Sequence, residues 1–119
     1  MTPNKLNIIL MADDYHKRTK GLMFHKPLSE MECALFCFAS PGKHSFWNKN
    51  VSFPISLIFC DDDGSVEDIR YLEAEQTSGI YPDSHRIKYV IEAHSELPKL
   101  LSLRKGSRTK IKGQEVFFE

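Results

Sequence analysis

The sequence predicts a mainly β protein at the margin of the α+β class: a compact β-sandwich or barrel with two short helices. The 119 residues, 41% of them hydrophobic, suit one domain (1–119) built around one core. The apolar runs are short and are separated by turn-forming Gly, Pro and Asp residues, which is typical of strands. Signals for the start of a helix occur in two short segments.

The N-terminal segment predicts a strand followed by a helix. Residues 7–11 form a short apolar run, which we interpret as a strand. Asp13 and Asp14 follow it and are suited to cap a helix and to stabilise its first turn electrostatically. The helix is expected to span about three turns, with Leu22 and Met23 as its apolar anchors.

The middle of the chain predicts several strands. Residues 33–39 are apolar throughout, and the turn-forming residues at 40–42 are expected to end this strand. The chain is expected to resume as a strand at 45–47. Residues 55–60 carry apolar side chains on both faces, which indicates a central position in the sheet. An Asp-rich turn then leads into 66–72, which is expected to pair back as a hairpin.

The C-terminal part predicts a long loop, a strand, a helix and two edge strands. Residues 73–86 show no periodicity, and a loop of this length in a small domain is usually functional or mobile. Residues 87–92 predict a strand. A second helix is expected over 95–103, capped by its first residue. Residues 109–111 and 116–118 are expected to add edge strands.

The charge balance argues against nucleic acid as a partner. Lys and Arg together number 16, as do Asp and Glu, so the formal net charge is zero. Nucleic-acid-binding proteins depend on an excess of Lys and Arg to displace counterions. No apolar run approaches the ~20 residues of a membrane span, so no membrane association is expected. The three cysteines, an odd and sparse set, favour a reduced cytoplasmic protein over a secreted disulfide scaffold.

Neither a metal nor a cofactor is expected. On a helix, Cys33 and Cys37 would lie one turn apart, but on the strand predicted here they would lie about 13 Å apart, too far for a disulfide or shared zinc coordination, so both are expected to be small buried apolar residues. The acidic run at 61–63 is similar to the start of a calcium loop, but the twelfth position holds Leu72 where an EF-hand has Glu. We therefore interpret the run as a hairpin turn. The five histidines show no metal-binding spacing.

The segment from Phe46 to Asn50 is the most informative for function. Lys49 lies two residues after Trp47 and is followed by the amide side chain of Asn50. Together these side chains can hold a carboxylate, a phosphate or a sugar through charge-assisted hydrogen bonds and stacking. The alternative is that Lys49 is a solvated surface residue and Asn50 a turn former.

The loop at 73–86 is the expected rim of this site, because loops on a rigid scaffold commonly carry binding residues. The predicted ligand-binding residues are Trp47, Lys49, Asn50, Tyr81 and Arg86. Their two cations, two aromatic rings and one amide suit a small polar or anionic ligand.

Several short motifs follow one another in the order of a known family. They are Gly21-Leu22-Met23-Phe24, Leu35-Phe36-Cys37-Phe38, Phe46-Trp47-Asn48-Lys49-Asn50, Pro54-Ile55-Ser56-Leu57-Ile58-Phe59, Asp63-Gly64 and Lys88-Tyr89-Val90-Ile91-Glu92. Over about residues 5–112 the chain resembles the domain of unknown function 192, also called uncharacterised protein family 0127. The resemblance implies a compact β-rich sandwich or barrel of jelly-roll-like character and no established activity.

The chain departs from the family pattern at three places. The family usually has Met where this chain has Asn48, an acidic residue where it has Ser56, and Gly-Met where it has Cys33-Ala34. If the acidic residue were catalytic or bound a metal, this protein would lack that group. Lys49 and Asn50 match the pattern and remain the leading site residues.

Three functions are open on this basis. The favoured one is a binding module for a small molecule. The second is an enzyme in which Lys49 acts as an electrophile or a base and needs an acid–base partner; the sequence offers Asp83, His85 and Glu92. The third is an accessory protein that forms homo-oligomers through its C-terminal edge at 116–118, where two phenylalanines are expected to be exposed.

Overall fold

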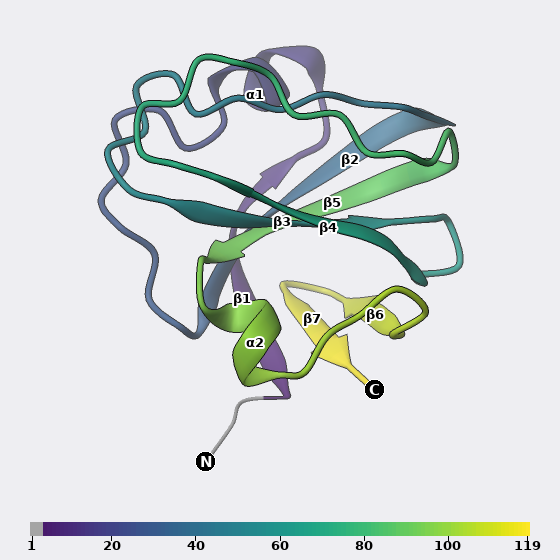
Figure 1. Ribbon diagram of the computed structural model, residues 1–119. Helices are drawn as coiled ribbons and strands as arrows, with labels where there is room; N and C mark the ends of the chain where they lie inside the picture. Colours follow the sequence, from purple (N-terminus) through teal and green to yellow (C-terminus); the bar gives the residue numbers. More distant parts are fainter. Residues whose placement is uncertain (1–3) are drawn as a thin grey trace.

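The strands of the protein form one seven-stranded sheet (Figure 1). The computed structural model describes residues 4–119. The sheet order is β4-β3-β5-β2-β1-β7-β6, and every neighbouring pair is antiparallel except the parallel pair β1 and β2. This confirms the mainly β prediction with two short helices. The elements in chain order are β1 (Lys5–Ala12), α1 (Tyr15–Lys20), β2 (Glu32–Gly42), β3 (Ile55–Cys60), β4 (Val66–Leu72), β5 (Ile87–His94), α2 (Leu97–Leu100), β6 (Thr109–Lys112) and β7 (Glu115–Phe118).

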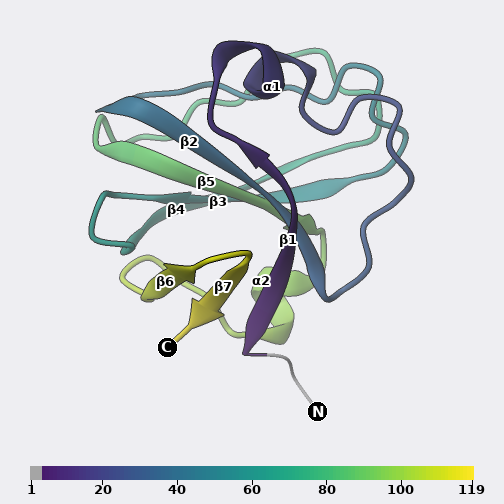
Figure 2. The same cartoon turned by 180° about the vertical axis from the view of Figure 1, so that it is seen from behind.

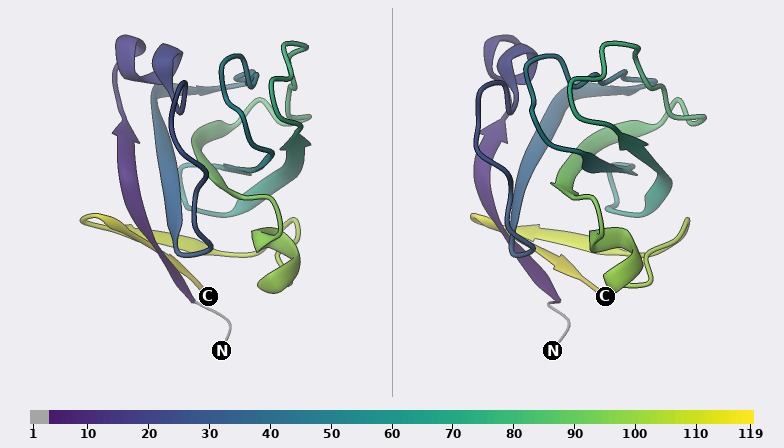
Figure 3. Two further views of the ribbon diagram at one scale, coloured as in Figure 1. Left: turned by 90° about the vertical axis from the view of Figure 1, so that its left-hand side faces the viewer. Right: turned by 60° about the vertical axis from the view of Figure 1, so that its left-hand side comes forward.

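The sheet curls and carries a separate apolar core on each face. In Figures 1 and 2, α1 and the long loops lie above the sheet, and α2 with the β6–β7 hairpin lies below it. Figure 3 shows the hairpin crossing beneath the long strands. The upper core consists of Ala12, Leu22, Leu28, Ala34, Phe36, Val51, Phe53, Ile55, Leu57, Phe59, Leu72, Ile87 and Val90. The lower core consists of Leu6, Ile8, Cys33, Leu35, Ile58, Cys60, Val66, Ile91, Ala93, Leu97 and Val116.

Strand β3 is central, as its sequence predicts. It lies between β4 and β5, and all six of its residues are buried. Alternation sends Leu57 and Phe59 into the upper core and Ile58 and Cys60 into the lower core. The hairpin from β3 to β4 also forms as predicted.

Helix α1 is shorter than the sequence analysis predicts. Asp14 caps it, since its Oδ1 accepts the N–H of Lys17 at 2.8 Å. The helix ends at Lys20 because Gly21 adopts φ +48°, a conformation that glycine tolerates and other residues rarely do. Leu22 is still buried, but it belongs to the turn after the helix.

Strand β2 is longer than predicted and continues to Gly42. Its pairing with β5 shifts register between Cys37 and Gly42. In this irregular stretch, cationic side chains satisfy backbone carbonyl groups that have lost their strand partners. The Arg18 guanidinium donates to Cys37 O, and the Lys88 ammonium donates to the carbonyl oxygens of residues 38 and 39. The stretch therefore stays ordered although it leaves regular pairing. The strand expected at 45–47 is reduced to one bridge, between Phe46 and Ile80.

The C-terminal elements differ in two ways from the prediction. Helix α2 has four residues, and no side chain caps it at Glu96, so the expected cap at Ser95 is wrong. Strand β7 pairs with both β1 and β6, so β6 is the edge strand, and Phe117 and Phe118 are half-buried. Within residues 4–119, no helix has the length and apolar character needed to cross a membrane.

Candidate functional site

A cavity of about 650 Å³ lies between the upper face of the sheet and the segments above it. Its inner wall comes from the sheet: Phe36, which is 2% exposed, and Glu92, which is 4% exposed. Its rim comes from α1 and the two long loops, where Tyr15, Trp47 and Tyr81 are 46–79% exposed. The cavity therefore runs from a mostly apolar interior to an aromatic and polar mouth.

Phe46 fixes the 43–54 loop over the sheet. Its ring meets Phe36 edge to face at 5.1 Å between centroids and Phe59 at 5.9 Å. Its backbone exchanges hydrogen bonds of 3.0 and 2.8 Å with Ile80 in the opposite loop. Such ring pairs add about 1 kcal/mol each beyond their burial. Because Phe46 is held inward, Trp47 lies at the mouth of the cavity.

Lys49 carries an uncompensated charge at this mouth. Its Nζ lies 5.5 Å from the centroid of the Trp47 ring. Lys49 forms no hydrogen bond or ion pair with any of residues 4–119, and its side chain is exposed. The ammonium is thus oriented by an aromatic face and is available to an incoming anion.

Arg18 supplies a second cation from α1. Its guanidinium lies 5.2 Å from the centroid of the Phe38 ring and donates to Cys37 O at 2.9 Å. His44 stacks on the same Phe38 ring, with the centroids 3.6 Å apart. Phe38 therefore holds a cation and an imidazole at the cavity wall.

Asn48 is buried below Trp47 and Lys49. Its Nδ2 donates to Phe53 O and to Glu73 O, both at 3.0 Å. Because both partners are carbonyl groups, the nitrogen must face them and Oδ1 must face away. Oδ1 has no hydrogen-bond partner among residues 4–119. Asn48 ties the 43–54 loop to the end of β4 and leaves an unsatisfied acceptor on a residue that lines the cavity.

Glu92 is the main site residue that the predicted set omits. It lies in the middle of β5, paired with Ala34 on one side and Leu57 on the other, both in the upper core. Burial raises the pKa of this carboxyl to about 8. The only sequence signal was one acidic residue within a mostly apolar strand.

The structure brings three of the five predicted site residues to the cavity: Trp47, Lys49 and Tyr81. Asn50 lies outside its lining; it adopts φ +60°, and its carbonyl accepts the N–H of Phe24 at 2.8 Å. Asn50 thus has the turn role that the sequence analysis kept as an alternative.

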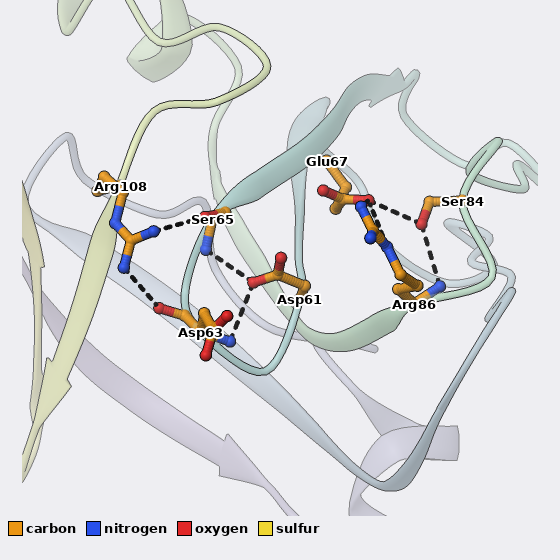
Figure 4. Close-up of polar contacts among 7 residues, drawn as sticks. All are labelled: Asp61, Asp63, Ser65, Glu67, Ser84, Arg86 and Arg108. Atoms are coloured by element: carbon orange, nitrogen blue, oxygen red, sulfur yellow. Dashed lines mark hydrogen bonds and ion pairs between the residues drawn. The ribbon is translucent and has the colours of Figure 1, made fainter.

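Arg86 also lies outside the cavity lining. Its guanidinium pairs with Glu67 at 2.9 Å, and Ser84 donates to the same carboxylate oxygen (Figure 4). These bonds lower the pKa of Glu67, with the Arg86 hydrogen bond as the largest cause. The loop at 73–86 therefore contributes Tyr81 to the cavity and uses Arg86 to hold itself to β4.

The acid–base partners considered for Lys49 are not positioned near it. Asp83 bonds to Arg70 at 3.3 Å, and His85 is exposed outside the cavity lining. Glu92 alone among the three lines the cavity, and it forms no ion pair with Lys49. Within residues 4–119, none of the three groups therefore makes with Lys49 the hydrogen-bond contact that a general acid–base pair needs.

Ser56 faces away from the cavity. It is fully buried on the lower side of β3, and its hydroxyl group lies 3.0 Å from His94 O and 3.3 Å from Ala93 O. The departure from the family's acidic residue therefore alters the lower face and not the cavity.

The acidic turn from Asp61 to Asp63 joins β3 to β4, as its sequence predicts. Carboxylate oxygens of the three aspartates lie within 4.8 Å of one another. One oxygen of Asp61 accepts the N–H groups of Asp63 and Ser65 at 3.0 and 2.9 Å, and Arg108 donates to Ser65 Oγ and Asp63 O (Figure 4). The polar groups of the turn thus act on its own backbone.

The three cysteines are unpaired. Cys33 and Cys60 lie in the lower core, where burial raises the pKa of each thiol to about 12. Both thiols are therefore protonated near neutral pH and are poor nucleophiles. Cys37 is only partly buried, and desolvation is the largest cause that raises the pKa of its thiol.

Comparisons with known proteins agree with this fold. A crystallised protein of unknown function from Novosphingobium aromaticivorans superposes with a TM-score of 0.80 at 24% identity, covering 85% of this chain and 72% of the other. A protein from Sinorhizobium meliloti, proposed to be a transcription regulator, superposes with a TM-score of 0.79 at 22% identity, covering 87% and 89%. At these identities the likeness shows the fold alone. No curated protein matches the chain. The model of the family DUF192 (Uncharacterized ACR, COG1430) matches residues 3–111, and the chain therefore belongs to the DUF192 family.

Proposed function

We propose that the cavity binds a small anionic molecule with a planar apolar body. The observation that carries this proposal is the charge of Lys49, which is held against Trp47 at the mouth of the cavity without a partner among residues 4–119. A ligand carboxylate or phosphate would supply the missing partner through charge-assisted hydrogen bonds.

The local charge supports an anion. Arg18, Lys20 and Lys49 line the cavity, and the carboxyl of Glu92 is the one acidic group of its described lining. Because the pKa of Glu92 is about 8, most of it is neutral at pH 7, and the lining has a net positive charge. The whole chain has no net charge, so the positive charge is local, which suits a small anion better than a polyanion.

The walls support a planar apolar body. Phe36, Phe38 and Phe46 line the inner part, and Trp47 and Tyr81 line the mouth. Their faces and edges can pack against an aromatic or unsaturated ring. A volume of about 650 Å³ lies within the range of small-molecule sites, roughly 300–1,000 Å³.

A titration with 2-naphthoate tests the proposal. Trp47 is the only tryptophan, so its indole N–H gives a single reporter signal at the site in a ¹H–¹⁵N spectrum. We expect a saturable shift of this signal, and we expect Lys49→Gln to weaken binding about threefold to tenfold, because it removes a charged hydrogen-bond donor. Isothermal calorimetry gives the affinities.

Matched variants act as controls. Lys110→Gln removes an exposed lysine of β6, and Arg86→Gln removes the predicted arginine that lies outside the cavity; both should bind 2-naphthoate like the wild type. Absence of a saturable shift, or an equal loss in Lys49→Gln and Lys110→Gln, contradicts the proposal.

We also infer a cytoplasmic location and no nucleic-acid partner. The unpaired cysteines support a reducing compartment, and the zero net charge supports a partner other than a polyanion. The enzyme and oligomer alternatives stay predictions, and no contact of residues 4–119 favours either over binding.

A further inference from the structure

We propose that the inner end of the cavity recognises an uncharged amide-type group through Glu92, so that the ligand carries an anionic group at one end and a carboxamide or lactam at the other. This inference rests on the proposed binding function and specifies the chemistry of its ligand. Its basis is that a buried carboxyl, that of Glu92, lines the cavity and has no partner among residues 4–119.

The carboxyl of Glu92 carries the inference. The residue is 96% buried, and its carboxyl forms no hydrogen bond or ion pair with residues 4–119. A buried carboxyl without a partner is costly to the fold, and such groups in proteins are normally satisfied by a neighbour, water or a ligand. The cavity is the space from which a partner can reach it.

The surroundings of Glu92 favour its neutral form. The residues paired with Glu92 on the two neighbouring strands are Ala34 of β2 and Leu57 of β3, and neither is charged. Burial is the sole cause of its raised pKa, so no surrounding cation offsets it. The titratable and charged groups that share the cavity with it are Tyr15, Arg18, Lys20, His44, Lys49 and Tyr81.

These features determine the type of group that fits. A neutral carboxyl donates one O–H bond and accepts at its carbonyl oxygen, and an amide offers the matching C=O and N–H. A second carboxylate at this end of the ligand would be disfavoured, because it would place a charge in a poorly solvated interior without a cation.

Calorimetric titrations with two probes test the inference: 2-naphthoate and 6-carbamoyl-2-naphthoate, which adds one carboxamide at the far end. In the wild type at pH 6.5 we expect the carboxamide to raise affinity about tenfold. In Glu92→Leu, an apolar replacement of similar size, we expect the carboxamide gain, which is the ratio of the two affinities within one variant, to fall below about twofold. In Glu92→Gln, which keeps a donor and an acceptor, most of the gain should remain.

The outcomes separate this inference from the binding function. If 2-naphthoate binds and the carboxamide gives no gain in the wild type, the inference is overturned and the binding function stands. The same holds if Glu92→Leu keeps the full gain. If neither probe binds, both proposals fail. The ¹H–¹⁵N spectrum of each variant verifies that it is folded.

Discussion

The two faces of the sheet differ in whether a buried polar side chain has a hydrogen-bond partner within the protein. On the lower face, Ser56 is fully buried, and its hydroxyl lies within hydrogen-bonding distance of two carbonyl oxygens. On the upper face, Glu92 lies on the neighbouring strand, next to Leu57, and has no partner among residues 4–119. Both residues are central in the same sheet, so the difference lies in what covers each face.

The covering explains the difference. The β6–β7 hairpin and α2 close the lower face with apolar residues such as Val116 and Leu97 (Figure 3). The upper face is covered by α1 and loops, which leave a cavity over part of the strands. The lower face is therefore closed by apolar packing, whereas the upper face leaves the carboxyl of Glu92 at a cavity without a protein partner among residues 4–119, which costs stability.

The pH dependence of unfolding offers the largest test of this contrast. The Glu92 carboxyl has an ordinary pKa of 4.5 and a folded pKa of about 8, so between these values the unfolded chain binds fewer protons, and stability falls as pH rises. Glu92→Gln lacks this dependence. We expect its stability advantage over the wild type to grow from near zero at pH 4.5 to roughly 4 kcal/mol at pH 8, at about 1.4 kcal/mol per pH unit.

Urea unfolding at several pH values measures this advantage. Glu67→Gln is the matched control with the opposite sign: the pKa of Glu67 is lowered, chiefly by the Arg86 hydrogen bond, so its contribution to stability is lost as pH falls. A constant difference between Glu92→Gln and the wild type across pH 4.5–8 would show that Glu92 is not a buried neutral acid.

An intermediate effect is expected at Asn48, the polar anchor of the upper face. Asn48→Ala removes two buried hydrogen bonds and should lower the free energy of unfolding by about 2 kcal/mol. Asn50→Gly is the control: residue 50 has a positive φ that glycine adopts freely, so its stability should stay within about 0.5 kcal/mol of the wild type. Urea unfolding measures both variants. An equal loss of unfolding free energy in the two would show that Asn48 is no more important to the fold than Asn50.

The smallest effect is expected at Ser56 on the lower face. Ser56→Ala should cost about 1 kcal/mol, because it removes one hydroxyl donor and leaves the apolar packing intact. Ser52→Ala, at an exposed position, should be nearly neutral in the same urea titration. Loss of 2-naphthoate binding in Ser56→Ala would contradict the separation of the two faces.

Much of the fold was predictable, because strand periodicity and turn residues act locally. The all-buried run at 55–60 and the acidic turn after it lead to β3 and its hairpin with β4. The errors lie at element ends. Gly21 ends α1 early through its positive φ, and β2 passes its turn-forming residues because Arg18 and Lys88, distant in sequence, bond the carbonyl groups there.

The candidate site was predictable only in part. Trp47 and Lys49 lie two positions apart in the sequence, so their contact could be predicted from local spacing alone. Tyr81 was inferred from the loop that carries it, and the same argument wrongly grouped Arg86 with it, although Glu67 holds Arg86 elsewhere. Glu92 was one of several acids, and only the register of β5 between β2 and β3 places it at the cavity.

By itself, the sequence determined the mainly β class, the central strand, the hairpin turn and the cation beside a tryptophan. Each of these depends on residues within a few positions of one another, where the strand period and turn chemistry act directly. Only the tertiary structure decided which face of the sheet is closed and which is open, and that Arg18, Lys49 and Glu92 share one cavity. Those three residues come from a helix, a loop and a strand, and their proximity depends on the strand order and curl of the sheet, which no local spacing encodes.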